Sequence, residues 1–151
     1  MVMIPTVLEP RMRARMLDRL RRLRPDAPAR WGTMTASQML AHLGDQLRHT
    51  LGDATAAPRR GPLRLPGVKQ LVMYWLPWPK GRVKGPPEAF LTRPTTWDAD
   101  MATFELLLDR FVAQSDRREW PPHAIFGRMT RGSWGRFCHR HFDHHFRQFG
   151  V

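Results

Sequence analysis

Apolar residues recur at helical spacing in four separate stretches of the chain. In the first stretch, about residues 8 to 24, the apolar stripe consists of Met12, Met16, Leu20 and Leu23. Arginines occupy most of the other positions, and Pro25 disfavours a helical residue before it. This pattern predicts an amphipathic helix that packs one side against a core and exposes the other to solvent.

A capping motif marks the start of the second predicted helix. In "TASQ", the Thr35 hydroxyl can accept from an exposed backbone amide while Gln38 reaches back, which is a capping box. We expect this helix to end near Gly52. Helical spacing places one set of residues on its inner face: Met39, His42, Leu43, Gln46 and Thr50.

Two further helices are predicted in the second half of the chain. The third runs from about residue 98 to 115 and the fourth from after Thr130 to the end. The inner stripe of the third is formed by Met101, Phe104, Leu108, Phe111 and Val112. Four helices and no strand pattern predict an all-α fold, a four-helix bundle that forms a single domain over residues 1–151.

A long stretch rich in Pro and Gly, residues 53–97, connects the second and third predicted helices. So long a connection is unusual in a compact domain, and we expect it to wrap around the bundle and cover a site. Trp75 and Trp78 are its expected anchors. The alternative is a partly mobile crossover whose aromatic side chains only cover the core.

Composition limits the classes of protein to which the chain can belong. Its 151 residues are 42% hydrophobic, which is enough for one packed core, and its formal net charge is +12. That charge makes nucleic acid a candidate partner. The arginines concentrate in the first helix and in loops, however, so a solvated basic surface is favoured. Composition does not decide whether the chain forms a homodimer.

Cysteine content and hydropathy bear on the compartment. The single Cys138 excludes an internal disulfide, which agrees with a reducing cytoplasm. The opening residues lack the apolar stretch of a signal peptide. The longest apolar run, which starts at Leu71, is far shorter than the ~20 residues that cross a bilayer. We therefore expect a cytoplasmic protein without a membrane partner.

The chain ends in "HRHFDHHFRQFGV", where histidines are concentrated. On a helical wheel His141 and His145 lie on the inner stripe with Trp134, whereas His139 faces the opposite side and His144 lies at the edge. Two histidines at positions i and i+4 can bind one metal ion. The alternative is a pair of core histidines with separate hydrogen bonds.

A third histidine favours the metal interpretation. His42 lies on the apolar face of the second predicted helix and can meet His141 and His145 across the bundle, which leaves a fourth coordination position open. Gln148 can orient a ligand or contact substrate, although a helix-end hydrogen bond explains it equally well. Glu105 is a candidate acceptor for a metal-ligating histidine, or an added ligand, but a surface position is favoured for it.

The arrangement of His42 followed by "HFDHHFRQ" in the last helix resembles the DinB-like superfamily, whose last helix carries H-x-x-x-H and then Gln three residues later. The stretches "RWGTMTASQMLAHLGD", "PWPKG" and "HAIFGRMTRGSWGRF" are similar to a branch of bacterial proteins grouped as domain of unknown function 1569. The resemblance implies a four-helix bundle with a long crossover between its second and third helices. One departure is "HAIFG", where His-Pro is expected before Phe-Gly, which affects loop rigidity.

The same resemblance implies a divalent metal ion, zinc or nickel, bound by His42, His141 and His145. Characterised members of the superfamily include metal-dependent thiol transferases that use bacillithiol or mycothiol, so a low-molecular-weight thiol is a candidate cofactor. The chemistry of three neutral imidazoles fits activation of a thiol or water toward a small electrophile, with an unknown substrate and no assigned catalytic residue. The alternatives are a non-catalytic metal-binding or ligand-binding bundle, or a basic nucleic-acid-binding module.

Overall fold

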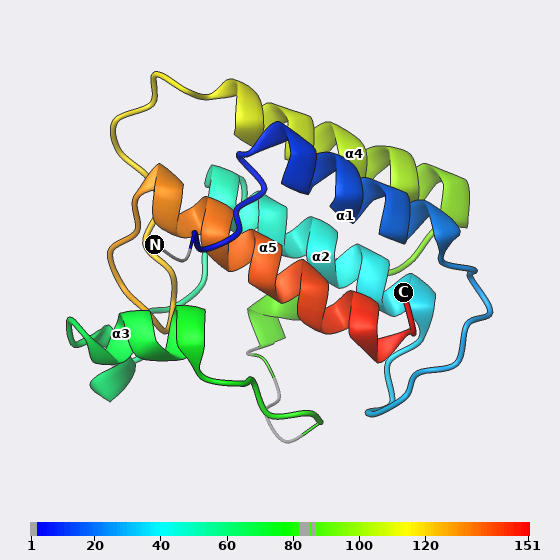
Figure 1. Cartoon of the computed structure of the whole chain (residues 1–151), viewed down its shortest axis with the longest axis horizontal. Helices are drawn as coiled ribbons and strands as arrows, with labels where there is room; N and C mark the ends of the chain where they lie inside the picture. Colours follow the sequence, from blue (N-terminus) through cyan, green and yellow to red (C-terminus); the bar gives the residue numbers. More distant parts are fainter. Residues whose placement is uncertain (1–2, 82–84, 86) are drawn as a thin grey trace.

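The fold consists of helices and connecting loops (Figure 1). The computed structural model describes residues 3–81, 85 and 87–151, and within these ranges it has no β-strand, only an isolated bridge between His123 and Gly127. The long helices are α1 (Pro10–Arg22), α2 (Ala36–Leu51), α4 (Trp97–Ala113) and α5 (Arg131–Gln148). The predicted all-α class is confirmed. None of the described helices has the length and apolar character needed to cross a membrane.

Side-chain caps fix where the long helices begin. Thr35 accepts from the Gln38 backbone amide while the Gln38 side chain accepts from Thr35, so the predicted capping box is confirmed. Thr96 caps α4 and Thr130 caps α5 in the same way, through the hydroxyl oxygen. At the other end of α2, Gly52 has a φ of 88°, a left-handed conformation that glycine adopts without strain.

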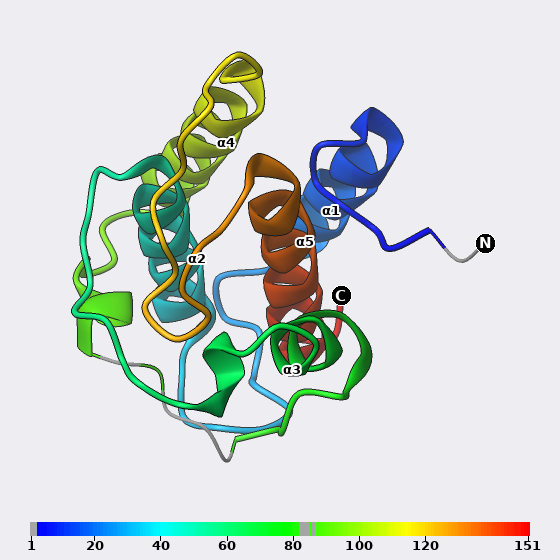
Figure 2. The ribbon, with the colours of Figure 1, turned by 90° about the vertical axis from the view of Figure 1, so that its left-hand side faces the viewer.

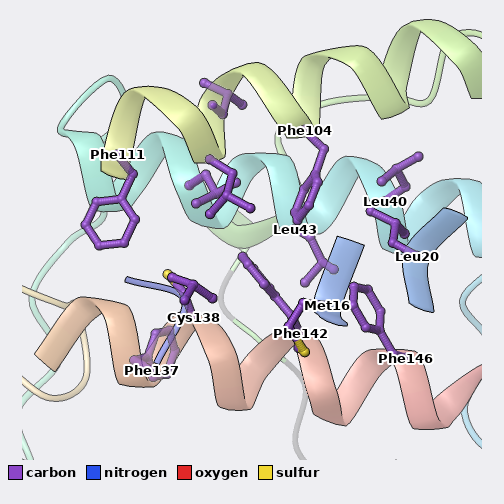
Figure 3. Close-up of a cluster of buried hydrophobic side chains, with 14 of the residues drawn as sticks. Met16, Leu20, Leu40, Leu43, Phe104, Phe111, Phe137, Cys138, Phe142 and Phe146 are labelled. Carbon is purple, nitrogen blue, oxygen red and sulfur yellow. The ribbon is translucent and has the colours of Figure 1, made fainter. Parts of the chain in front are cut away.

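One hydrophobic core lies between the long helices. Helix α2 packs between α4 and α5, and α1 covers α5 on its other side (Figure 2). Figure 3 shows aromatic side chains of α4 and α5 meeting aliphatic side chains of α1 and α2 in this core. The largest fully buried side chains include Trp134, Phe104, Phe111, Phe142, Phe146, Leu20 and Met39. The inner stripes predicted from helical spacing therefore face the core, except for Met12, which is only half-buried and lies outside it.

The segment between α2 and α4 contains short helical turns. These are η1 (Pro62–Arg64), α3 (Val68–Gln70), η2 (Leu71–Trp75) and η3 (Pro87–Phe90). Trp78 anchors the segment as predicted, because its indole donates to the Val72 carbonyl and its ring lies against Phe137. The expectation that Trp75 is a second anchor is wrong. Trp75 is 56% exposed, since Met73 is the residue of this turn that enters the core.

Candidate metal centre

Three histidines from two helices bring their ring nitrogens together. His42 comes from α2, and His141 and His145 come from successive turns of α5. The Nε2 atom of His141 lies 3.1 Å from Nε2 of His42 and 3.1 Å from Nε2 of His145. Helical geometry explains the α5 pair, because residues four positions apart lie on the same face. The structure thus brings together the three histidines that helical spacing selected.

The histidine triad, His42, His141 and His145, is shielded from solvent. The three residues are between 6% and 9% exposed. On one side Phe90 stacks on the His42 ring, with centroids 4.7 Å apart and planes 16° from parallel. On the other side Trp78 lies against His141, with centroids 5.9 Å apart. Aromatic side chains from the crossover therefore limit the access of water to the triad.

Hydrogen bonds at the outer ring nitrogens define the tautomers of two triad members. The Nδ1 of His42 donates to the Ala89 carbonyl at 2.7 Å, and the Nδ1 of His145 donates to Oε1 of Gln148 at 2.8 Å. Both acceptors are oxygens without a hydrogen to donate, so Nδ1 carries the proton in each ring. Each Nε2 then presents a lone pair toward His141. Such partners are typical of metal-ligating histidines.

His141 has an unsatisfied ring nitrogen. Its Nδ1 is buried and has no hydrogen-bond partner among the described residues. If Nδ1 carries the proton, a buried donor is unpaired and three lone pairs converge at the Nε2 atoms. If Nε2 carries it, that proton satisfies only one of two facing lone pairs, and Nδ1 is an unpaired acceptor. A cation at the three Nε2 atoms removes the lone-pair repulsion, so the donor set fits a metal ion.

The surroundings of the triad favour neutral imidazoles. Burial lowers the pKa of His42, His141 and His145 below the ordinary value of 6.5, and for His145 the pKa falls to about 3. Desolvation is the main cause, and nearby histidines add to it, four of them for His141 and two for His145. Because a metal ion binds the unprotonated nitrogen, the triad is in its metal-binding form at neutral pH.

Gln148 links the triad to the loop before α2. Its Oε1 accepts from His145, and its Nε2 donates to the Trp31 carbonyl at 2.8 Å. The side chain is buried, so both ends of the amide are satisfied inside the protein. Sequence reasoning selected Gln148 but missed Trp31 and the Ala89 carbonyl. A backbone acceptor carries no signature in the sequence, so only the need for some acceptor could have been inferred.

The end of the crossover is fixed on α2 by buried polar contacts. Asp45, one turn after His42, accepts from the Thr92 backbone amide at 2.8 Å and from Arg48 at 3.0 Å. His49 donates from Nε2 to the Glu88 carbonyl at 2.8 Å. Glu88 belongs to the short turn η3, and Thr92 follows this turn. The end of the segment between α2 and α4 therefore lies over the His42 side of the triad.

Other sequence candidates lie apart from the triad. Glu105 does not belong to the group of potential metal ligands, and both of its carboxylate oxygens accept from Arg21, at 3.1 and 3.2 Å. Cys138 is fully buried, and desolvation raises the pKa of its thiol to about 12. His144 lies between the Trp31 and Trp78 rings, at the rim of the site. This half-buried position agrees with its place at the edge of the inner stripe.

An open basic pocket lies beside Gln148, which bonds to two of its lining residues, Arg30 and Trp31. Its lining consists of Arg30, Trp31, Lys80 and Arg147. The Lys80 ammonium lies 4.9 Å from the centre of the Trp31 ring, and Arg147 forms an ion pair with Asp143 at 2.9 Å. Trp31 belongs to both the pocket and the hydrogen-bond chain to His145. Positive charge is therefore concentrated close to the triad.

Comparison with known protein families finds a match over almost the whole chain. A family profile described as "Protein of unknown function (DUF1569)" matches residues 10–150. No curated protein and no solved structure matches the chain. The matched range includes both helices that supply the histidine triad, so the site lies within the part of the chain that defines the family.

Proposed function

The chain belongs to the DUF1569 family, and we propose that it binds one divalent metal ion, zinc or nickel, through the Nε2 atoms of His42, His141 and His145. The convergence of these three atoms carries the proposal. Two nitrogens that each lie ~2.0–2.1 Å from zinc at a tetrahedral angle are ~3.3 Å apart. The two Nε2 separations from His141 are 3.1 Å, close to that value, and all three ligand atoms lie within 4.8 Å of one another.

We also infer a four-helix bundle of the DinB-like type. Four long helices around one core, and a long segment between the second and third of them, support this assignment. The positions of the histidines support it further, since one lies on the second long helix and two lie on the last. The fold assignment and the metal assignment thus rest on the same helices.

The reaction that fits this site is attack by a thiol or water on a small electrophile. Three neutral imidazoles leave the charge of a divalent cation uncompensated, and such an ion acidifies a bound water or thiol. The protein's own groups perform the other tasks. Ala89 and Gln148 hold two imidazoles in the correct tautomer, while Trp78 and Phe90 limit the access of bulk water.

The basic pocket supports a negatively charged small molecule or thiol as the partner of this site. Arg30, Lys80 and Arg147 present donors to an anionic group, and the Trp31 ring offers a flat apolar surface beside them. A low-molecular-weight thiol that carries a carboxylate combines the anionic group for this pocket with the thiol for the metal site. The proposal of an anionic partner rests on the proposed metal site, because the hydrogen bond between Gln148 and Trp31 connects the pocket to the histidine triad.

A non-catalytic metal-binding bundle is the second candidate. One observation favours it: within the described residues, the cluster of potential ligands contains no carboxylate that could act as a general base. A thiol reaction needs no such base, whereas hydrolysis usually does. Measuring consumption of a free thiol with a chlorodinitrobenzene electrophile separates the candidates, because only an enzyme accelerates displacement of chloride when metal is bound.

Metal titration tests the proposal itself. Protein freed of metal by chelation is titrated with Zn²⁺ and with Ni²⁺ in a calorimeter, and we expect one ion per chain. His145→Ala and His42→Ala should lose this uptake while they keep the helical circular-dichroism spectrum. His139→Ala is the matched control, since His139 lies on the same helix outside the triad. Stoichiometric uptake by His145→Ala would show that the ligands are other residues.

A further inference from the structure

The turn formed by α3 and η2 exposes an apolar face. Its five large side chains are Leu65 (56% exposed), Val68 (37%), Leu71 (47%), Trp75 (56%) and Leu76 (45%). Lys69 is the only charged residue between positions 65 and 79, and its ammonium is directed to the Arg128 carbonyl. In a chain with 25% charged residues, this apolar face is an unusual part of the surface.

The apolar face is held in a fixed position. Met73, on the opposite side of the turn, is fully buried, and Val72 and Tyr74 pack against the core. Arg140 of α5 donates to the carbonyl oxygens of Tyr74 and Leu76. Figures 1 and 2 show the turn at the edge of the molecule beside α5, away from α4. The exposed side chains therefore point outward because the inner ones are already packed.

Positive charge surrounds the apolar face. Residues 54–81 contain five Lys or Arg residues and no Asp or Glu, and residues 120–142 also contain no Asp or Glu. The second range includes the part of α5 that packs against η2, where the Arg136 guanidinium lies 5.9 Å from the centre of the Tyr74 ring. The segments that form and adjoin the face are thus cationic and apolar, and they contain no carboxylate of their own.

We propose that the apolar face, Leu65, Val68, Leu71, Trp75 and Leu76, binds the surface of a membrane that contains anionic lipids. Trp and Leu side chains bury well at the boundary between headgroups and acyl chains, and the surrounding Arg and Lys residues attract anionic headgroups. The expectation of no membrane partner considered only a segment that crosses the bilayer. Binding to the surface needs no such segment.

A second copy of the chain is a poorer occupant for this face. Two chains that each carry a net charge of +12 repel one another, and here the cations lie around the face itself. Five partly exposed side chains also provide less than the ~800 Å² per partner of a standard protein interface. An anionic lipid surface complements both the charge and the apolar character. This proposal is independent of the proposed metal site.

Vesicle flotation with the full-length chain tests the proposal. We expect the protein to float with vesicles of phosphatidylcholine and phosphatidylglycerol, to bind weakly to phosphatidylcholine alone, and to lose binding as salt increases. The double variant Leu71→Ser, Trp75→Ser should bind the anionic vesicles about tenfold more weakly, because two half-exposed apolar side chains no longer enter the lipid. Both positions are exposed, so the thermal midpoint should stay close to that of the wild type.

The matched control is Leu106→Ser, since Leu106 is 61% exposed but lies on α4. It should bind the anionic vesicles like the wild type. Three results would overturn the proposal: no flotation with anionic vesicles at low salt, equal binding to neutral vesicles, or unchanged binding of the double variant. Sedimentation that shows a wild-type dimer and a monomeric double variant would assign the face to self-association instead.

Discussion

Replacement of Gln148 by alanine should weaken metal binding and also destabilise the fold. The Gln148 side chain is 5% exposed and makes two hydrogen bonds of 2.8 Å, one to Nδ1 of His145 and one to the Trp31 carbonyl. Loss of a partner that orients a metal-ligating histidine costs ~10–100-fold in affinity, or ~1.4–2.8 kcal/mol. Loss of the donor to Trp31 removes a part-buried hydrogen bond and should lower the free energy of unfolding by ~1 kcal/mol.

Competition titration against a chelator of known affinity measures the first effect, and thermal or urea unfolding of metal-free protein measures the second. The variant Gln148→Glu separates the effect on metal affinity from the effect on stability. Its carboxylate still accepts from Nδ1 of His145, so metal affinity should stay within about threefold of the wild type, but it cannot donate to Trp31, so stability should fall. If Gln148→Ala binds metal as tightly as the wild type, Gln148 does not orient His145 and the reasoning fails.

Three further predictions concern pH, the thiol and the packing of the N-terminal segment. The pKa of His145 is near 3 in the folded chain against an ordinary 6.5, so only the unfolded state takes up a proton as pH falls below 6.5. As pH falls below 6.5, the metal-free protein should therefore lose ~1.4 kcal/mol of stability per pH unit because of this residue. An equal thermal midpoint at pH 7.5 and 5 would contradict the lowered pKa of His145. Cys138, with a pKa raised to about 12, should not react with a colorimetric disulfide reagent at pH 8 until the chain is unfolded, so rapid labelling of native protein would count against its burial. Gly135→Ala would place Cβ 2.5 Å from Oγ1 of Thr6, so urea unfolding should show ~1–3 kcal/mol less stability, and an unchanged midpoint would mean that this segment moves away at little cost.

Features governed by local periodicity could be predicted from the sequence. The capping box of Thr35 and Gln38 marks the start of α2 because its hydrogen bonds join residues three positions apart. His141 and His145 share a face because four residues are close to one helical turn. His42 could be added because its neighbours on α2 are apolar, so a histidine there needs a polar partner inside the protein.

Features of the crossover could not be predicted, because its path depends on long-range packing. Trp75 and Trp78 are both large aromatic residues in a loop rich in proline, and nothing local distinguishes the buried one from the exposed one. Met73 enters the core and Trp78 packs against it, so Trp75, which lies between them in the sequence, points outward. The Ala89 carbonyl that accepts from His42 was also missed, since any backbone carbonyl can play this role. Glu105 pairs with Arg21 because α1 lies beside α4, which a single helical wheel does not reveal.

The central claim is that the three histidines form one metal site. A crystal structure of protein loaded with Zn²⁺ or Ni²⁺, with anomalous data at the corresponding absorption edge, tests it most directly. We expect one anomalous peak within ~2.0–2.2 Å of the Nε2 atoms of His42, His141 and His145. A peak on other residues, or no peak at the triad in protein that was saturated with metal, would contradict it.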